Sequence, residues 1–143
     1  MHHIAIMKKS WGLIPKILTG EKTIESRWYQ TRRAPWGKIK IGDTIFFKNS
    51  GEPVTVKAKI SKALQFEIKN LATAKNIIKK YGREICLVNK NPKTWNRLPK
   101  YCILIWLANP QSIKKPFNID KRGFGISTAW LVVDDISKLK LDQ

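Results

Sequence analysis

Apolar and polar side chains alternate in the segment V-T-V-K-A-K-I-S-K at residues 54–62, and this alternation constrains the fold more than any other feature. The apolar positions are Val54, Val56, Ala58 and Ile60, and the polar positions between them are Thr55, Lys57 and Lys59. A period of two residues places the apolar side chains on one face of a β-strand and the polar side chains on the other. A strand that is buried on one face only is typical of an antiparallel sheet or barrel.

Seven further segments have the pattern of a strand or a helix. Strands are expected at residues 3–7, 22–29, 44–48, 101–108 and 127–136, and helices at residues 10–19 and 71–81. Gly20 and Gly82 follow the two helical patterns and are natural C-terminal stops. Pro15 is compatible with a helix only near its first turn, which would move the start of the first helix beyond Ser10.

The order of these elements predicts an α+β fold. One helix lies between the first two strands, and the other follows the fourth strand. Because most strands are expected to neighbour one another in chain order, they would form a small β-barrel of five or six mostly antiparallel strands with flanking helices. A chain of 143 residues without repeats or an obvious linker is expected to be a single domain spanning residues 1–143.

The chain is strongly basic, with 28 lysines and arginines against 10 acidic residues and a net charge of +18. Such a surface attracts polyanions, so nucleic acid is the first candidate partner and an anionic membrane surface the second. A general bias of the organism toward lysine would also explain the charge. Between Lys57 and Lys80 there are seven lysines and one acid, Glu67, and the sequence assigns this stripe no role.

Several classes of function are disfavoured by what the chain lacks. Cys86 and Cys102 are too few for a disulfide framework and are expected to be buried free thiols. His2 and His3 are the only histidines, so neither a metal site nor a histidine-activated nucleophile is expected, and no cofactor is predicted. No apolar stretch reaches the ~18 residues of a membrane span, so we expect a cytoplasmic protein. We also expect a monomer.

Lys22, Glu25 and Arg27 are the first candidate site residues. A carboxylate among cations should stay ionised, so Glu25 could orient Lys22, Arg27 or a ligand, or act as a base on a bound water. The alternative is an ion pair on the surface of the sheet, which would contribute little. Strand alternation places Lys22 on the opposite face from Glu25, unless the chain is still turning after Gly20.

Aromatic and basic residues alternate in the segment that follows. Arg32 and Arg33 could contact phosphates, and Trp36, held in a turn by Pro35 and Gly37, could stack on an unpaired base or plug the end of the barrel. Trp28 and Tyr29 are neighbours in a strand, so one is expected to face inward and the other outward.

Two loops and three tryptophans complete the candidates. The polar loop at residues 48–53, with Lys48 and Ser50, could cup an anion or be a plain hairpin turn. Arg122 lies in a glycine-containing loop that could contact phosphate or form a bulge before the last strand. Trp106 and Trp130 are predicted core residues because each lies in an apolar run, whereas Trp95 could stack on a basic loop.

The string W-G-L-I-P-K-I-L-T-G-E-K-T-I-E-S-R-W-Y, followed by K-I-G-D-T-I-F-F-K, resembles the ASCH domain, a branch of the PUA-like superfamily. The matching positions are Gly20, Lys22, Thr23, Glu25 and Arg27, and then Gly42 and Asp43. The resemblance covers residues 4–66 well, and residues 70–100 look like a helical insertion. It implies a five- or six-stranded barrel whose G-x-K-x-x-E-x-R residues line a cleft.

The resemblance also implies a class of function. PUA-like domains commonly bind RNA and some ASCH domains bind DNA, so we expect nucleic-acid binding, with RNA preferred. The expected binding residues are Lys22, Glu25, Arg27, Trp28, Arg32, Arg33, Trp36, Lys48, Ser50 and Arg122. A non-catalytic module that docks on ribosomes is a further possibility.

A second implied function is catalytic. Some small bacterial ASCH proteins are amidohydrolases that remove acyl groups from N4-acylated cytidine with a lysine, a threonine and a glutamate. Lys22 matches the lysine, but Glu25 stands where the threonine is expected, and Thr23 and Glu67 are the nearest other candidates. If the protein is an enzyme, Lys22 would activate the water or nucleophile and Glu25 would move protons. A ribonuclease activity is also attached to the family, although no residue here specifies a cleavage site.

Overall fold

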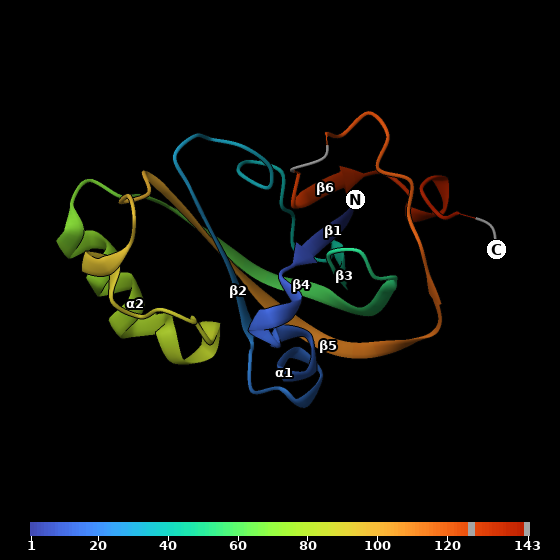
Figure 1. Ribbon diagram of the computed structural model, residues 1–143, viewed down its shortest axis with the longest axis horizontal. Coiled ribbons are helices and arrows are strands. Elements are labelled where there is room, and N and C mark those ends of the chain that lie inside the picture. The colour runs from blue at the N-terminus through green and yellow to red at the C-terminus, as the bar shows by residue number, and fades with distance from the viewer. Residues whose placement is uncertain (126–127, 142–143) are drawn as a thin grey trace.

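The computed structural model describes residues 1–125 and 128–141, and it contains one curled sheet with two α-helices (Figure 1). The strands are β1 (His2–Met7), β2 (Ile24–Tyr29), β3 (Thr44–Asn49), β4 (Val54–Glu67), β5 (Tyr101–Phe117) and β6 (Trp130–Val133). The helices are α1 (Leu13–Thr19) and α2 (Leu71–Ile85), with short 3₁₀ turns at Lys9–Trp11, Pro92–Thr94 and Ile136–Lys138.

The six strands lie in the order β2-β5-β4-β3-β1-β6, and only the β1–β3 pair is parallel. The sheet curls into a half-barrel, which confirms the predicted α+β fold with mostly antiparallel strands. The prediction that strands neighbour one another in chain order is right for β3, β4 and β5. It is wrong for β1, β2 and β6, because β2 crosses to the far edge beside β5.

Several element boundaries differ from the prediction. Gly12 has a φ of +63°, which separates the 3₁₀ turn from α1 and places Pro15 in the first turn of that helix. β2 begins at Ile24 rather than at residue 22, so Lys22 lies in the turn after Gly20. β4 and β5 extend well beyond the predicted ranges, and β6 is shorter than predicted. Residue 127 of that last prediction lies outside the described residues.

The two helices cover opposite faces of the sheet. Leu13, Ile14 and Ile17 of α1 pack on the inner face, against side chains such as Ile105. α2 packs on the outer face, where Ile77 belongs to the same apolar cluster as buried side chains of β2 and β5. A third cluster lies between the sheet and the C-terminal segment and contains Phe46, Phe117, Ile119, Leu131 and Ile136.

The predicted core tryptophans and thiols are partly as expected. Trp130 is 3% exposed, which confirms it as a core residue, whereas Trp106 is only half-buried and packs edge-on against Tyr81 of α2. Cys102 is buried as predicted, and burial raises the pKa of its thiol. Cys86 is half-buried because it follows the last turn of α2. No helix in the described part of the chain is long and apolar enough to cross a membrane.

Candidate functional site

A pocket of about 570 Å³ lies between β1 with the start of α1 on one side and β2 with the end of α2 on the other. Most of its wall is apolar or aromatic, and rings of Trp11, Trp28, Tyr29 and Trp95 contribute to it. These rings come from three separate stretches of the chain, so the tertiary fold alone brings them together. A concave, largely apolar pocket with a few placed polar groups is the usual form of a ligand site.

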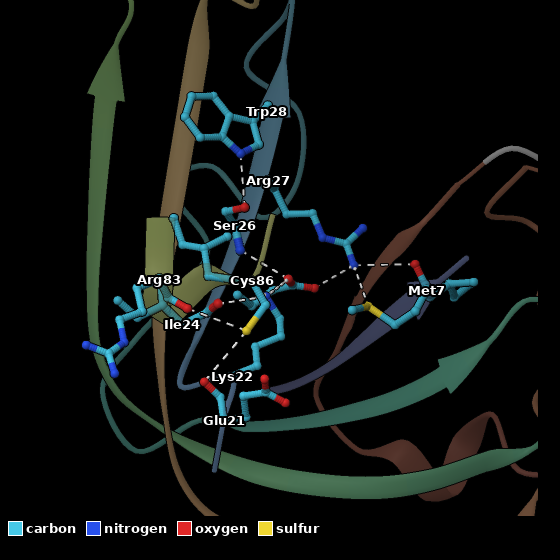
Figure 2. Close-up of polar contacts among 12 residues, drawn as sticks. Met7, Glu21, Lys22, Ile24, Ser26, Arg27, Trp28, Arg83 and Cys86 are labelled. Carbon is cyan, nitrogen blue, oxygen red and sulfur yellow. Dashed lines mark hydrogen bonds and ion pairs between the residues drawn. The ribbon is translucent and has the colours of Figure 1, made fainter. Parts of the chain in front are cut away.

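Lys22 lines this pocket and is 2% exposed. Figure 2 shows its side chain among its polar partners. Its ammonium donates to the carbonyl oxygens of Ile24 at 2.7 Å and Ile85 at 2.5 Å. It also lies 3.2 Å from Oε1 of Glu25. An ammonium has three donors, and all three are engaged here. Lys22 therefore joins the C-terminus of α2 to the start of β2 and reaches Glu25, which settles the doubt raised by strand alternation.

Glu25 is 3% exposed and accepts from two cations. Oε1 accepts from Lys22 and from the amide of Ser26 at 3.1 Å, and Oε2 accepts from Arg27 at 3.0 Å. Burial by itself would raise the pKa of Glu25, but the charges and hydrogen bonds of Lys22 and Arg27 outweigh it and lower the pKa below its usual value. The pocket therefore contains an ionised carboxylate whose Oε2 has acceptor capacity left.

Arg27 extends from β2 across the curled sheet to its opposite edge. Its guanidinium donates to the carbonyl oxygens of Ala129 at 3.2 Å and Ile6 at 3.4 Å, and it lies 5.1 Å from the ring centroid of Trp130. Figure 2 shows the same group meeting Met7. Because β2 is the first strand of the sheet order and β1 the fifth, Arg27 ties the two ends of the half-barrel together.

Two of the aromatic side chains are held in position by hydrogen bonds. Trp28 Nε1 donates to the hydroxyl of Ser26 at 2.9 Å, and Trp95 Nε1 donates to the carbonyl of Asn89 at 3.1 Å. The two rings meet edge to face with centroids 5.1 Å apart. Rings that are fixed in this way lose little conformational entropy when a flat ligand stacks against them.

β2 also presents backbone groups to the pocket because it is an edge strand. The amide of Leu107 donates to the carbonyl of Thr23, so odd-numbered residues of β2 pair with β5 and even-numbered residues point their backbone groups away from it. The amide of Ser26 is used by Glu25, which leaves the carbonyl of Ser26 and the amide of Trp28 directed to the side that the pocket occupies. These groups offer one acceptor and one donor to a ligand.

Comparison with solved structures finds the same architecture in the ASCH protein of Zymomonas mobilis. Its crystal structure matches with a TM-score of 0.67 and 18% identity, over 96% of this chain and 91% of that one. A variant with tyrosine replaced by phenylalanine matches at 0.68 and 18%, and one with serine replaced by alanine at 0.68 and 19%. The chain has the ASCH fold. No family model and no curated protein matches its sequence.

Within this ASCH fold, the arginine-rich segment lies beside the pocket rather than in it. Arg33 lies over the ring of Tyr29, 5.1 Å from its centroid, and so reaches a residue of the pocket wall. Arg32 instead pairs with Glu67 at 2.7 Å. Trp36 packs edge-on against a tyrosine of β5 and is half-buried, which agrees better with a plug than with an open stacking surface.

The remaining predicted phosphate contacts are dispersed over the ASCH fold. Lys48 is 8% exposed, and burial lowers the pKa of its ammonium, with a further lowering from the charge of Lys121. Ser50 is exposed, and its amide donates to the carbonyl of Met7 in a turn. Arg122 is exposed and forms an ion pair at 2.7 Å with Asp120, whose pKa it lowers to about 2. None of these three lines the aromatic pocket.

The two weaker catalytic candidates also lie away from Lys22. Thr23 lines a second, polar pocket of about 530 Å³ on the other side of the β2 turn, and its amide donates to the carbonyl of Glu84. Glu67 pairs with Tyr101 on β5 whereas Glu25 pairs with Ile105, so the two residues are offset by about 13 Å along β5 and lie on opposite sides of that strand. The aromatic pocket therefore contains Lys22 and Glu25 but neither Thr23 nor Glu67.

The sequence marked Trp95 as a possible stacking residue, but it did not mark Trp11, Val88 or Asn89 as part of the site. Trp11 and Val88 line the pocket and are 47% and 66% exposed, although both are large and apolar. Asn89 and Trp95, in the connection from α2 to β5, supply the rest of that side. Exposed apolar residues have no local sequence signal; the packing of α2 against β2 brings Val88 to the site, and Trp11 reaches it from the turn before α1.

Proposed function

We propose that this protein binds RNA and that the aromatic pocket takes one unpaired base. The observation that carries the proposal is the combination, in one pocket, of fixed tryptophan rings with a buried ionised carboxylate. Proteins recognise single-stranded RNA by stacking splayed bases on aromatic rings and by hydrogen bonds to the base edges. The net charge of +18 supports a polyanionic partner.

Trp28 and Trp95 would provide the stacking surface. Glu25 would accept a hydrogen bond from an exocyclic amine or a ring N–H through Oε2. The amide of Trp28 and the carbonyl of Ser26 would pair with other positions of the base edge. Because these polar groups are few and fixed, they support a preference among bases rather than uniform binding.

Phosphates would be held by cations at the rim of the pocket. Lys8 lies 5.9 Å from the ring centroid of Trp11, and Arg33 lies 5.1 Å from that of Tyr29, so each is next to a ring of the wall. Lys22 and Arg27 use their donors inside the protein and would position Glu25 instead of contacting phosphate. Binding through phosphates would weaken steeply with salt.

The amidohydrolase alternative has less support from the geometry. Lys22 has all three donors engaged, and neither Thr23 nor Glu67 reaches it. Its test is turnover of N4-acetylcytidine followed by chromatography, with Lys22→Ala as control. Release of cytidine by the wild type and not by the variant would contradict a purely binding role.

The direct test is quenching of tryptophan fluorescence by single nucleosides and by short single-stranded RNA. Trp28→Ala should weaken nucleoside binding about fivefold or more, since stacking contributes roughly 1–3 kcal/mol per base. Trp36→Ala is the matched control because it removes a half-buried ring outside the pocket. Equal losses in the two variants, or none in Trp28→Ala, would show that the pocket does not take the base.

A further inference from the structure

Three lysines of the lysine-rich stripe noted in the sequence form a defined surface on the outer face of the sheet. Lys57, Lys59 and Lys62 of β4 are exposed, and the register shift between Ile60 and Lys62 leaves all three on the outer face. Lys62 pairs with Trp106, which packs on Tyr81 of α2, so this end of the row lies beside that helix and Lys57 lies toward the other end of the strand. We name Lys57, Lys59 and Lys62 the lysine face.

Two more cations extend the lysine face at its ends. Toward α2, Lys62 lies 4.7 Å from the ring centroid of Trp106, and Lys80 lies 5.3 Å from that of Tyr81, which packs on Trp106. Toward the C-terminus, Lys57 pairs with Phe46, whose ring meets that of Phe117, and Lys140 lies 4.4 Å from the centroid of that ring. The cations therefore follow one another from α2 across β4 to the C-terminal segment.

Nothing on the described chain neutralises these charges. The described salt bridges involve none of the five lysines, and the contact of Lys59 is with the neutral hydroxyl of Thr44 at 2.7 Å. Glu67, the one acid within the stripe, faces Arg32 at the far end of β4. A row of uncompensated cations destabilises the folded chain by self-repulsion, so a polyanion that covers it would be bound favourably.

A membrane surface fits this face less well than a nucleic acid. Surfaces that lie on membranes combine cations with exposed large apolar side chains that enter the lipid. Leu141, beside Lys140, is exposed at one end of this face, whereas exposed apolar side chains such as Trp11, Leu18 and Val88 belong to other elements. The lysine face instead combines cations with half-buried rings, which suits a phosphate backbone.

We propose that the lysine face is a second contact for RNA, which holds the sugar–phosphate backbone of the strand independently of its sequence. The choice of RNA as the polyanion rests on the proposed function of the pocket. The two surfaces would have different roles, because the pocket would select a base and the lysine face would supply affinity. A polynucleotide would then bind much more tightly than a single nucleoside.

The test compares salt dependence in two variants that lose the same charge. Fluorescence anisotropy of a labelled single-stranded RNA of about 20 nucleotides is measured across a range of KCl concentrations. The triple change Lys57→Gln, Lys59→Gln and Lys62→Gln should lower the slope of log affinity against log salt by about 2, since each phosphate contact on a single strand contributes roughly 0.7. If the variant and the wild type bind equally at about 1 M salt, this difference in slope makes the variant about 100-fold weaker than the wild type at about 0.1 M salt.

The matched control changes three exposed lysines away from this face to glutamine. These are Lys69, Lys75 and Lys79. Around the helix axis, Lys75 and Lys79 point about 100° or more away from Lys80. The control should change the slope by less than about 1, and circular dichroism should show both variants folded. Equal slopes in the two triple variants would overturn the proposal, because net charge alone would then explain the binding.

Two further measurements keep the proposals separate. Quenching of tryptophan fluorescence by nucleosides reports binding in the pocket and should be unchanged in the variant that lacks Lys57, Lys59 and Lys62. If nucleosides do not quench the wild type, the proposed base pocket is refuted. The salt slopes of RNA binding would still test the lysine face. Flotation with vesicles of phosphatidylserine and phosphatidylcholine tests the membrane. Vesicle binding lost in the triple variant, with RNA affinity unchanged, would assign the face to lipid and overturn the proposal.

Discussion

Glu25→Gln should destabilise the fold strongly, because Glu25 is the centre of the network that joins both edges of the sheet. At an effective dielectric constant of about 20, charges 3.2 Å apart attract by about 5 kcal/mol, and burial offsets part of this attraction. Removing one partner of a buried ion pair costs about 3–5 kcal/mol. Glutamine keeps one acceptor oxygen and Lys22 keeps two carbonyl partners, so we expect the lower value, about 3 kcal/mol, or about 10 °C in melting temperature.

The measurement is urea unfolding followed by tryptophan fluorescence at neutral pH. Glu67→Gln is the matched control, since it removes the same charge from an ion pair whose side chains are 56% and 54% exposed. That change should cost less than about 1 kcal/mol. If the two variants lose equal stability, or if Glu25→Gln loses less than about 1 kcal/mol, the argument for a network that ties the half-barrel together is refuted.

The same variant tests the pH dependence. The pKa of Glu25 is lower in the folded protein than in the unfolded chain, so its contribution is complete above the unfolded value of about 4.3 and is lost as the pH falls toward the folded value. The wild type should therefore lose stability below about pH 4 more steeply than Glu25→Gln. Parallel pH profiles would contradict the assignment of Glu25 as an ionised buried carboxylate.

Three further changes test other parts of the structure. Burial lowers the pKa of His3 despite its hydrogen bond to Asp43. The free energy of unfolding should therefore fall as the pH drops below about 6.5, by up to about 1.4 kcal/mol per pH unit, because the unfolded chain binds a proton that the folded His3 does not. His3→Asn should remove that slope from urea unfolding curves. Lys48→Met should raise the free energy of unfolding by about 1 kcal/mol, because the ammonium is desolvated, and a lower midpoint would count against this. Arg27→Met should lower the melting temperature more than Arg122→Met, since Arg122 only pairs with an exposed loop acid.

Some features of the fold could be predicted because they depend on local backbone geometry. Alternation in residues 54–60 sets which side chains of β4 face the core, and the apolar spacing in residues 71–81 places α2. The prediction that Gly82 ends this helix is wrong, because α2 continues through Gly82 to Ile85 and Cys86 is its C-cap. The neighbours of β1, β2 and β6 could not be predicted, because pairing in chain order holds only for β3, β4 and β5. The connection from β1 to β2 carries β2 to the far edge of the sheet beside β5, and neither its length nor its composition indicates this destination.

The site was predicted in part. The spacing of Lys22, Glu25 and Arg27 marked them as a group, and the structure does bring the three together. Their expected contact with phosphates has no support in the geometry, because burial makes each cation a partner of the protein itself. Lys48 illustrates the same effect, since a lysine at the end of a strand looks exposed in sequence but is buried here.

By itself the sequence determined the strongly basic surface, the periods of the strands and helices, and a cluster of charged residues at the start of β2. These follow from the chemistry of neighbouring residues and from backbone geometry over a few positions. Only the tertiary structure decided that Lys22 meets Ile85, that Arg27 reaches Ala129, and that Trp95 faces Trp28. Such contacts join residues far apart in the chain, and they form only when packing of the whole half-barrel fixes where each element lies.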